Sequence, residues 1–156
     1  MKLVSVIVLS YRSAETMIKI LDSIKSQTYP NIELIITDDC SPDESVEVAK
    51  RWIDANQGCL TAIKLVTAEQ NTGIPGNINR ALEQATGDYL KLIAADDYMT
   101  EEAIQEYVSF CEQNPKAIPI AKERIRALEH KGFCLSEELV IGHDGTKYDS
   151  YYVREV

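Results

Sequence analysis

Residues 3–11 of the chain read LVSVIVLSY, and this stretch decides the fold. Residues 3–9 form a nearly continuous apolar run rich in valine and isoleucine. Such a run is typical of a strand buried on both faces of a parallel sheet, because a strand with one solvated face alternates apolar and polar residues. Ser10 and Tyr11 then mark its carboxyl end. We therefore predict an α/β domain built around this strand.

The alternation of a short apolar strand with an amphipathic helix repeats four times along residues 3–111. We predict strands at residues 3–9, 32–37, 62–66 and 89–94. Apolar residues at helical spacing follow each strand, as in the first helix at Met17, Ile20, Leu21 and Ile24. In the third helix, predicted at residues 75–85, they are Ile78, Ala81, Leu82 and Ala85. This order requires a mostly parallel sheet covered by helices on both faces.

Helix starts are marked by residues that favour N-terminal caps. Ser13 is placed to cap the first helix, and Thr100 is placed to cap the fourth. Before the second helix, Ser41 and Glu44 form a capping-box pattern around Pro42, which would occupy the first helical position.

Residues beyond 115 give weaker patterns. We predict a fifth strand at residues 118–121 and a turn at residues 142–145 between two short extended pieces. The sequence has no internal repeat and no low-complexity linker, so we interpret residues 1–156 as a single domain.

The charge of the chain excludes several classes of partner. Sixteen basic against 25 acidic residues leave a formal net charge of -9. This surplus opposes nonspecific attraction to nucleic acid backbones and anionic lipids, so we expect no nucleic acid partner. It would also repel a nucleotide diphosphate, and phosphate chemistry here therefore needs a cation or a cluster of backbone donors.

Cysteine spacing and hydropathy indicate a cytoplasmic protein. The four cysteines form no CxxC pair, which predicts neither a zinc site nor a redox motif. The apolar run at residues 3–9 is too short for a signal peptide. No segment approaches the roughly 20 apolar residues of a membrane span.

Polar residues directly follow three of the predicted strands: Ser10 with Tyr11, Asp38 with Asp39, and Asp96 with Asp97. Ligands of open α/β sheets bind beyond the carboxyl ends of the strands, so we expect these residues to meet in one crevice. Two acidic pairs held close together repel and raise each other's pKa values. A divalent cation bound between them removes this repulsion. The structural alternative is that the acids only cap helices and form turns. Ser41 and Thr100 already serve as caps, which favours a functional role for the acids.

Five segments of the chain form a series: VSVIVLSY (4–11), SQTYPNIEL (26–34), DDCSPD (38–43), NTG (71–73) with Asn79, and GDYLKLIAADD (87–97). In this order and spacing they resemble family 2 glycosyltransferases. The resemblance implies a three-layer α/β/α, Rossmann-like GT-A fold with a mostly parallel central sheet. Residues 1–115 would form the nucleotide-sugar-binding part, and residues 116–156 a weakly matched tail of a truncated domain.

The resemblance implies roles for four nucleotide-binding residues. Ser10 and Tyr11 correspond to residues that pack against the base and ribose. Asp39 corresponds to the residue that hydrogen-bonds the base, commonly uracil. Asn79 matches the asparagine of the family and belongs to the same nucleotide-sugar-binding set.

Two further aspartates correspond to the Asp-x-Asp motif of the family. Asp97 matches its last acid, which holds a Mn²⁺ or Mg²⁺ ion against the diphosphate. Asp96 lies in the middle of the motif and faces the ribose or the sugar. Ala95 stands where the first acid would be, which removes one metal ligand without excluding the metal.

Other departures concern the loops beside this motif. Cys40 replaces the usual glycine after the acidic pair, and Ile78 replaces an arginine, while Arg80 lies on a different helical face. Residues 73–76, GIPG, invite a phosphate-loop interpretation, because helix N-termini attract anions. They lack the lysine and the spacing of a P-loop, and a simple turn into the helix is the favoured interpretation.

The function implied by the resemblance is inverting transfer of a sugar from a nucleotide sugar, most commonly a UDP sugar, to a glycan or lipid-linked acceptor. In the family the catalytic base lies beyond the Asp-x-Asp strand, and this sequence assigns no residue to it. We expect the chain alone to bind nucleotide sugar and to transfer it poorly. We expect a cytoplasmic location, with peripheral association at the inner membrane face through the full-length protein.

Three alternatives come from other classes. A non-catalytic nucleotide-sugar-binding module would share the same residues. A receiver-like phosphoacceptor domain would carry its acids after the first and third strands rather than the second and fourth. A dinucleotide-binding oxidoreductase would need GxGxxG after the first strand, where this chain has SYRSA.

Overall fold

The computed structural model describes residues 1–113, 134–141 and 147–154. They fall into two compact units, Met1–Ile104 and Gln105–Val156. The first unit contains a four-stranded sheet and all of the predicted site residues, and the second contains a two-stranded sheet.

The sheet of the first unit is parallel throughout, with the strand order β3-β2-β1-β4. Its strands are β1 (Val4–Ser10), β2 (Ile32–Asp38), β3 (Ala62–Thr67) and β4 (Tyr89–Ala94). All four predicted strands are therefore confirmed, with ends that differ by no more than one residue. This order is that of a Rossmann-type sheet and not the 2-1-3-4-5 order of receiver domains, which argues against the phosphoacceptor alternative.

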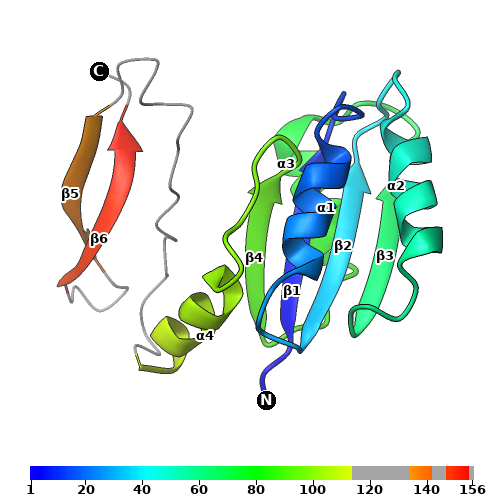
Figure 1. The fold of residues 1–156 in the computed structure, drawn as a ribbon. Helices are drawn as coiled ribbons and strands as arrows, with labels where there is room; N and C mark the ends of the chain where they lie inside the picture. The colour runs from blue at the N-terminus through cyan, green and yellow to red at the C-terminus, as the bar shows by residue number, and fades with distance from the viewer. Residues whose placement is uncertain (114–133, 142–146, 155–156) are drawn as a thin grey trace. The chain divides into compact units, whose positions relative to one another are not determined.

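Helices cover both faces of this sheet, as predicted. Figure 1 shows α1 and α2 in front of the strands and α3 behind them. Their bounds, with that of α4, are Met17–Lys25, Ser45–Ala55, Gly73–Leu82 and Ala103–Gln113. The first unit is thus a three-layer α/β/α structure in which both faces of β1 and β2 are buried.

The core explains why residues 3–9 dominate the fold. Successive side chains of a strand point to opposite faces, so Ile7 and Ile35 pack with Ala81 of α3 on one face. The stripe predicted for α1 is completely buried. Burying one such aliphatic side chain contributes about 1.5–3 kcal/mol, so β1 and β2, which are buried on both faces, contribute most of the apolar burial of the sheet.

The helix caps differ from the sequence predictions. The prediction of a capping box before α2 is wrong. The helix begins at Ser45, and the Ser41 hydroxyl donates to the Asp38 carboxylate instead of to the helix. The N-cap residue is Glu44, whose side chain makes no capping bond, and Asp43 before it accepts from the backbone N–H and hydroxyl of Ser45 (3.2 and 2.5 Å). At the start of α4, Gln27 Oε1 accepts from the Ile104 N–H (2.9 Å).

The second unit contains β5 (Cys134–Ile141) and β6 (Lys147–Arg154), which pair antiparallel. They are the two extended pieces that the sequence predicts. The turn predicted between them and the strand predicted at residues 118–121 lie outside the described residues. In the described ranges, no helix has the length and hydropathy needed to cross a membrane.

Candidate functional site

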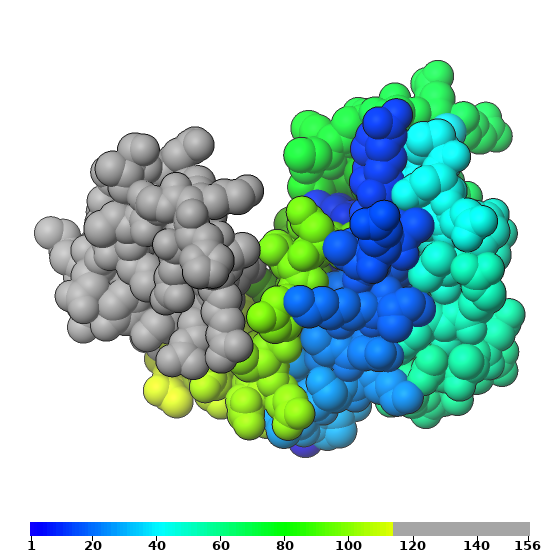
Figure 2. Space-filling view, turned by 45° about the horizontal axis from the view of Figure 1, so that its top comes forward, coloured from blue at the N-terminus to red at the C-terminus, as the bar shows by residue number. Residues whose placement is uncertain are grey.

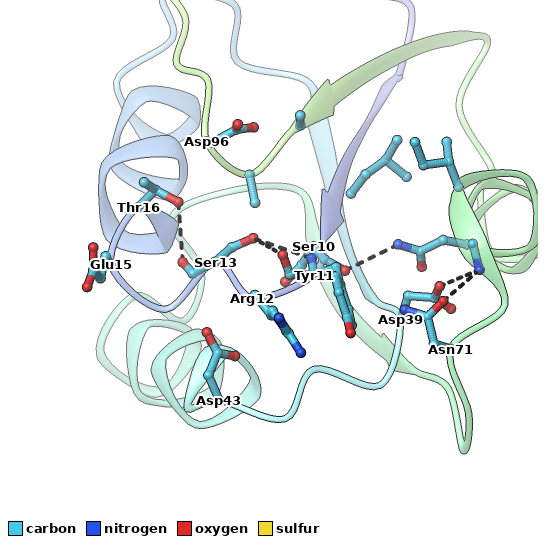
Figure 3. Close-up of a pocket in the computed structure, with 16 residues that line it drawn as sticks. Ser10, Tyr11, Arg12, Ser13, Glu15, Thr16, Asp39, Asp43, Asn71 and Asp96 are labelled. Atoms are coloured by element: carbon cyan, nitrogen blue, oxygen red, sulfur yellow. Dashed lines mark hydrogen bonds between the residues drawn. The ribbon is translucent and has the colours of Figure 1, made fainter.

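A pocket of about 770 Å³ lies at the carboxyl end of the parallel sheet. It is lined by the end of β1 with the following loop, the β2–α2 loop, the start of α3 and the end of β4 (Figure 3). β2 and β4 flank β1, so the strand order reverses at this point, which is where open α/β sheets bind ligands. Its volume is in the range of about 300–1,000 Å³ typical of small-molecule sites. Figure 2 shows the blue, cyan and green loops that meet at this end of the unit.

Four of the six predicted site residues line this pocket. They are Ser10, Tyr11, Asp39 and Asp96. Asp39, after β2, and Asp96, after β4, therefore open onto one pocket, as expected for the carboxyl ends of parallel strands. Asp97 is exposed on the same turn as Asp96 but does not line the pocket. Asn79 is exposed on α3 and does not line it either.

Asp39 is buried and joins the β2–α2 loop to the start of α3. Its carboxylate accepts from the backbone N–H groups of Thr72 (2.9 Å) and Gly73 (2.7 Å) and from the Thr72 hydroxyl (2.7 Å). Arg80 Nη2 adds an ion pair at 3.2 Å. Asp39 thus caps α3 from a distant loop, and the helix begins at Gly73 rather than at residue 75.

The pKa of Asp39 moves opposite to the prediction. Burial by itself raises the pKa, but the hydrogen bonds from Thr72, Arg80 and Gly73 outweigh burial and bring it below its usual value. The expected mutual repulsion of two acidic pairs does not control this group, because its negative charge is already compensated. Asp39 therefore stays ionised through the neutral range and remains a hydrogen-bond acceptor.

Asp38, the other acid of the pair, faces the interior instead of the pocket. It is fully buried and accepts from the hydroxyls of Ser10 (2.7 Å) and Ser41 (2.6 Å) and from the Ser41 N–H (2.8 Å). The Ser10 hydroxyl is therefore engaged inside the protein. These bonds fix the ends of β1 and β2 against each other.

Asn77 is a pocket residue that the sequence reasoning missed. It is buried on α3, and its amide oxygen accepts from the Thr37 hydroxyl (2.6 Å) and from Arg80 Nη1 (3.0 Å). Its amide nitrogen donates to the backbone carbonyls of Thr37 (3.3 Å) and Ser10 (3.4 Å). The apolar stripe predicted for α3 included Leu82, which is exposed. The available signal was the four-residue spacing from Asn77 to the buried Ala81.

The β2–α2 loop holds the β1–α1 loop by side-chain to backbone hydrogen bonds. The N–H groups of Arg12, Ser13 and Ala14 donate to the side chains of Ser41 (2.9 Å), Ser45 (2.7 Å) and Asp43 (3.3 Å), respectively. Burial raises the pKa of Asp43, but its hydrogen bonds from Ser45 and Ala14 lower it further than burial raises it. These bonds hold the loop that carries Tyr11 against the β2–α2 loop and the start of α2.

Two residues beside the pocket adopt left-handed backbone conformations. They are Arg12, with φ 55°, and Cys40, with φ 61°. A side chain in this region costs free energy that glycine does not incur. This explains the glycine that the family pattern has at the position of Cys40. The same strain at Arg12 is balanced by the hydrogen bond from its N–H to Ser41.

The turn interpretation of residues 73–76 is supported over the phosphate-loop interpretation. The backbone donors at the start of α3, the N–H groups of Thr72 and Gly73, already bond to Asp39. An internal carboxylate thus occupies the place that an anionic ligand would take. Gly73 has φ 73°, a turn conformation that suits glycine.

The donor set at the pocket fits a divalent cation only if a ligand supplies further oxygens. Within residues 1–113, 134–141 and 147–154, no group of three or more His, Cys, Asp or Glu side chains could hold a metal ion. Mg²⁺ commonly binds through one or two carboxylates together with substrate phosphates and water. Asp96 and Asp97 are adjacent and exposed, so they could supply the carboxylates of a site completed by substrate phosphates and water.

Comparisons with known proteins agree with this geometry. A model of the family described as Glycosyl transferase family 2 matches residues 5–132. Poly(ribitol-phosphate) beta-N-acetylglucosaminyltransferase TarS of Staphylococcus aureus is 28% identical over 121 residues, covering 76% of this chain and 20% of TarS. UDP-Glc:alpha-D-GlcNAc-diphosphoundecaprenol beta-1,3-glucosyltransferase WfaP of Escherichia coli is 33% identical over 112 residues, covering 72% of this chain and 42% of WfaP.

Solved structures give the same result. The structure of S. aureus TarS 1–349 in complex with UDP-GlcNAc matches with a TM-score of 0.63 at 26% identity, covering 76% of this chain and 37% of that one. The mannosyltransferase PcManGT from Pyrobaculum calidifontis, in complex with GDP-Man and Mn²⁺, matches with a TM-score of 0.70 at 28% identity, covering 74% and 34%. The chain spans less than half the length of each of these proteins.

Proposed function

The chain belongs to glycosyltransferase family 2, with the GT-A fold that its five sequence segments predict, and we propose that its pocket binds a nucleoside diphosphate sugar. A UDP sugar is the first candidate. The whole protein then transfers the sugar, with inversion, to a glycan or lipid-linked acceptor. The observation that carries this proposal is the convergence of Tyr11, Asp39 and Asp96 from three strand ends on one pocket. The nucleotide-sugar complexes of two structural relatives support it.

Asp39 suits the recognition of a base that carries a ring N–H. Its lowered pKa keeps it ionised, so it can only accept hydrogen bonds. Uracil, thymine and guanine each offer a ring N–H, whereas adenine and neutral cytosine do not offer one on the corresponding edge. The exposed ring of Tyr11 lines the same pocket and offers an apolar surface to the base or ribose.

The acids after β4 are assigned to the sugar-diphosphate end of the ligand. Asp97 would hold Mn²⁺ or Mg²⁺, and Asp96, which lines the pocket, would face the ribose or sugar. The cation, when bound, neutralises negative charge that develops on the departing diphosphate. The structure of PcManGT in complex with GDP-Man and Mn²⁺ supports the use of a divalent cation.

The transfer is an in-line displacement at the anomeric carbon. The acceptor hydroxyl oxygen forms the new bond, the bond from the anomeric carbon to the diphosphate oxygen breaks, and a base takes the hydroxyl proton. The residues of this pocket bind and orient the donor, and none of them is assigned as the base. We place the whole protein in the cytoplasm, at the inner membrane face when its acceptor is lipid-linked.

Isothermal titration calorimetry with UDP, GDP and TDP, each with and without Mn²⁺, tests the donor site. We expect UDP binding that Mn²⁺ strengthens, with the Mn²⁺-dependent part lost in Asp97→Ala. Asp54→Ala removes an exposed carboxylate near the carboxyl end of α2 that does not line the pocket, and it serves as the matched control. Failure of the chain to bind any of the three nucleotides would overturn the proposal.

A further inference from the structure

The pocket contains more negative than positive charge before any ligand arrives. Among its sixteen lining residues, four carry a carboxylate and Arg12 alone carries a positive charge. Two of the carboxylates already have partners within the protein, since Asp39 pairs with Arg80 and Asp43 accepts hydrogen bonds from Ser45 and Ala14. A diphosphate that enters the pocket therefore meets the carboxylates of Asp96 and Glu15. Arg12 is the lining side chain whose positive charge can offset their negative charge.

The side chain of Arg12 is exposed and available to a ligand. Its guanidinium carbon lies 5.3 Å from the centre of the Tyr11 ring, and Figure 3 shows the two side chains together at the pocket. Within the described residues its guanidinium takes part in no ion pair. A cation stacked on an aromatic face keeps its outward N–H groups free for an anion.

The backbone at Arg12 has an uncommon conformation that the neighbouring loop supports. Its left-handed φ of 55° is held by the hydrogen bond from its N–H to the Ser41 hydroxyl. A non-glycine residue kept in a strained conformation by its surroundings is a recurrent feature of ligand sites. Arg80 cannot substitute for it, because Arg80 is committed to Asp39, Asn77 and Thr72.

We infer that Arg12 is a donor-binding residue of this chain that contacts the diphosphate of the nucleoside diphosphate sugar. This inference rests on the function proposed above. The planar guanidinium can donate two parallel hydrogen bonds to phosphate oxygens, a geometry that lysine cannot reproduce. Arg12 thereby supplies positive charge in a pocket whose Asp-x-Asp motif lacks its first acid at Ala95.

Calorimetric titration with UDP and with uridine, both without metal, separates this role from recognition of the base. We expect Arg12→Gln to weaken UDP binding by roughly ten- to a hundredfold, the effect of losing charged hydrogen bonds, and to leave uridine affinity within about twofold. Arg12→Lys should lie between wild type and Arg12→Gln. Added salt should reduce UDP affinity less steeply in Arg12→Gln than in wild type.

Arg12→Gly separates the charge from the backbone conformation. Glycine adopts φ 55° without strain, so this variant should unfold at or above the wild-type temperature and still bind UDP as weakly as Arg12→Gln. Arg51→Gln, an exposed α2 position, is the control and should bind UDP like wild type.

Each result assigns failure to one of the two proposals. If wild type binds no nucleotide, the proposed function falls and the role of Arg12 falls with it. If wild type binds UDP and Arg12→Gln binds it equally well, the donor site stands and the role of Arg12 is overturned. Equal losses of UDP and uridine affinity would likewise overturn diphosphate contact, because they would place Arg12 at the base.

Discussion

Each end of the parallel sheet has a buried carboxylate, Glu33 or Asp39, that joins segments distant in sequence, but the surroundings of the two differ. At the amino end, Glu33 is 1% exposed and accepts from Ser5, Thr86 and Lys64. At the carboxyl end, Asp39 is 3% exposed and holds the start of α3. Both carboxylates join segments that are distant in sequence, and both have lowered pKa values.

The difference lies in what surrounds the two carboxylates. Around Glu33, Ser5 accepts in turn from the N–H of Gly87, and a Cβ on Gly87 would lie only 2.6 Å from the Ser5 backbone nitrogen, so no side chain fits there. Around Asp39, the exposed side chains of Tyr11, Arg12 and Asp96 line a pocket. Burial and hydrogen bonding of an acid therefore do not by themselves separate the two ends, and it is the exposed side chains beside Asp39 that indicate a binding function at the carboxyl end.

The largest effect is expected from Glu33→Ala. Lys64 and the hydroxyls of Ser5 and Thr86 would lose their acceptor. Leaving one buried donor unsatisfied typically costs about 1–3 kcal/mol, and Glu33 serves several donors at once. Urea denaturation should show this loss, with UDP affinity of the folded protein unchanged. Glu83→Ala, at an exposed position of the same charge, should cost less than about 0.5 kcal/mol. A Glu33 variant of wild-type stability would show that the amino-end network is not structural.

The pH dependence of stability should also show that ionised Glu33 stabilises the folded protein. Burial raises the pKa of Glu33, but the hydrogen bonds from Ser5, Thr86 and Lys64 outweigh burial and lower this pKa from 4.5 to about 2. A depressed folded-state pKa gives stability that is fully present above the unfolded pKa and lost as the pH falls from about 4.5 to about 2. The loss should amount to about 3 kcal/mol.

Urea midpoints of wild type and Glu33→Gln measured between pH 6 and pH 2 test this expectation. The stability difference between the two proteins should shrink as the pH falls, because the glutamine of the variant does not titrate. A difference that stays constant over this range would mean that Glu33 has an ordinary pKa in the folded protein.

Asp39→Asn should affect stability and binding together, which is the contrast with Glu33. The amide nitrogen of asparagine is a donor and would face the N–H donors of Thr72 and Gly73, so those bonds would be lost. The neutral side chain would also lose the ion pair with Arg80. We expect a loss of about 2 kcal/mol in urea denaturation and at least a tenfold loss of UDP affinity in calorimetry. Normal UDP affinity in the folded variant would make Asp39 a purely structural residue like Glu33.

The smallest effect is expected from Cys40→Gly, and it should be stabilising. Glycine removes the strain of φ 61°, partly offset by the greater freedom of the unfolded chain, for a net gain of up to about 1 kcal/mol. Thermal denaturation should show a raised midpoint. Cys59→Gly, at an exposed position without a positive φ, should not raise it. A lowered midpoint for Cys40→Gly would show that its Sγ contact with the Glu69 carbonyl outweighs the strain.

The four strands and the meeting of their polar ends were predictable, because both depend on local sequence patterns. Apolar runs specify β1 and β2, and the polar residues after β1, β2 and β4 must meet once those strands are parallel neighbours. The prediction that acids of two strand ends share one mouth needed only this alternation. It holds for Asp39 and Asp96.

The caps and the inward-facing asparagine were not predicted, because competing hydrogen-bond partners decide them, some of which are distant in sequence. Asp38 takes the Ser41 hydroxyl that a capping box would have used, and Gln27 reaches the start of α4 from 77 residues away. In α3, the buried face is set by the bonds of Asn77 to Thr37 and Ser10, so the exposed Leu82 misled a prediction based on apolar spacing. Sequence patterns report propensity, whereas these choices are made by competition among hydrogen-bonding partners.

The clasp between the β1–α1 and β2–α2 loops has a consequence for engineering the specificity of this enzyme family. Three consecutive amides of one loop depend on Ser41, Asp43 and Ser45 of the other. Transplanting residues 11–14 from a relative would leave those amides facing side chains that do not match them, whereas moving residues 11–14 and 41–45 jointly would keep donors and acceptors together. The two loops thus form one exchangeable cassette, and recombination libraries should cut outside both.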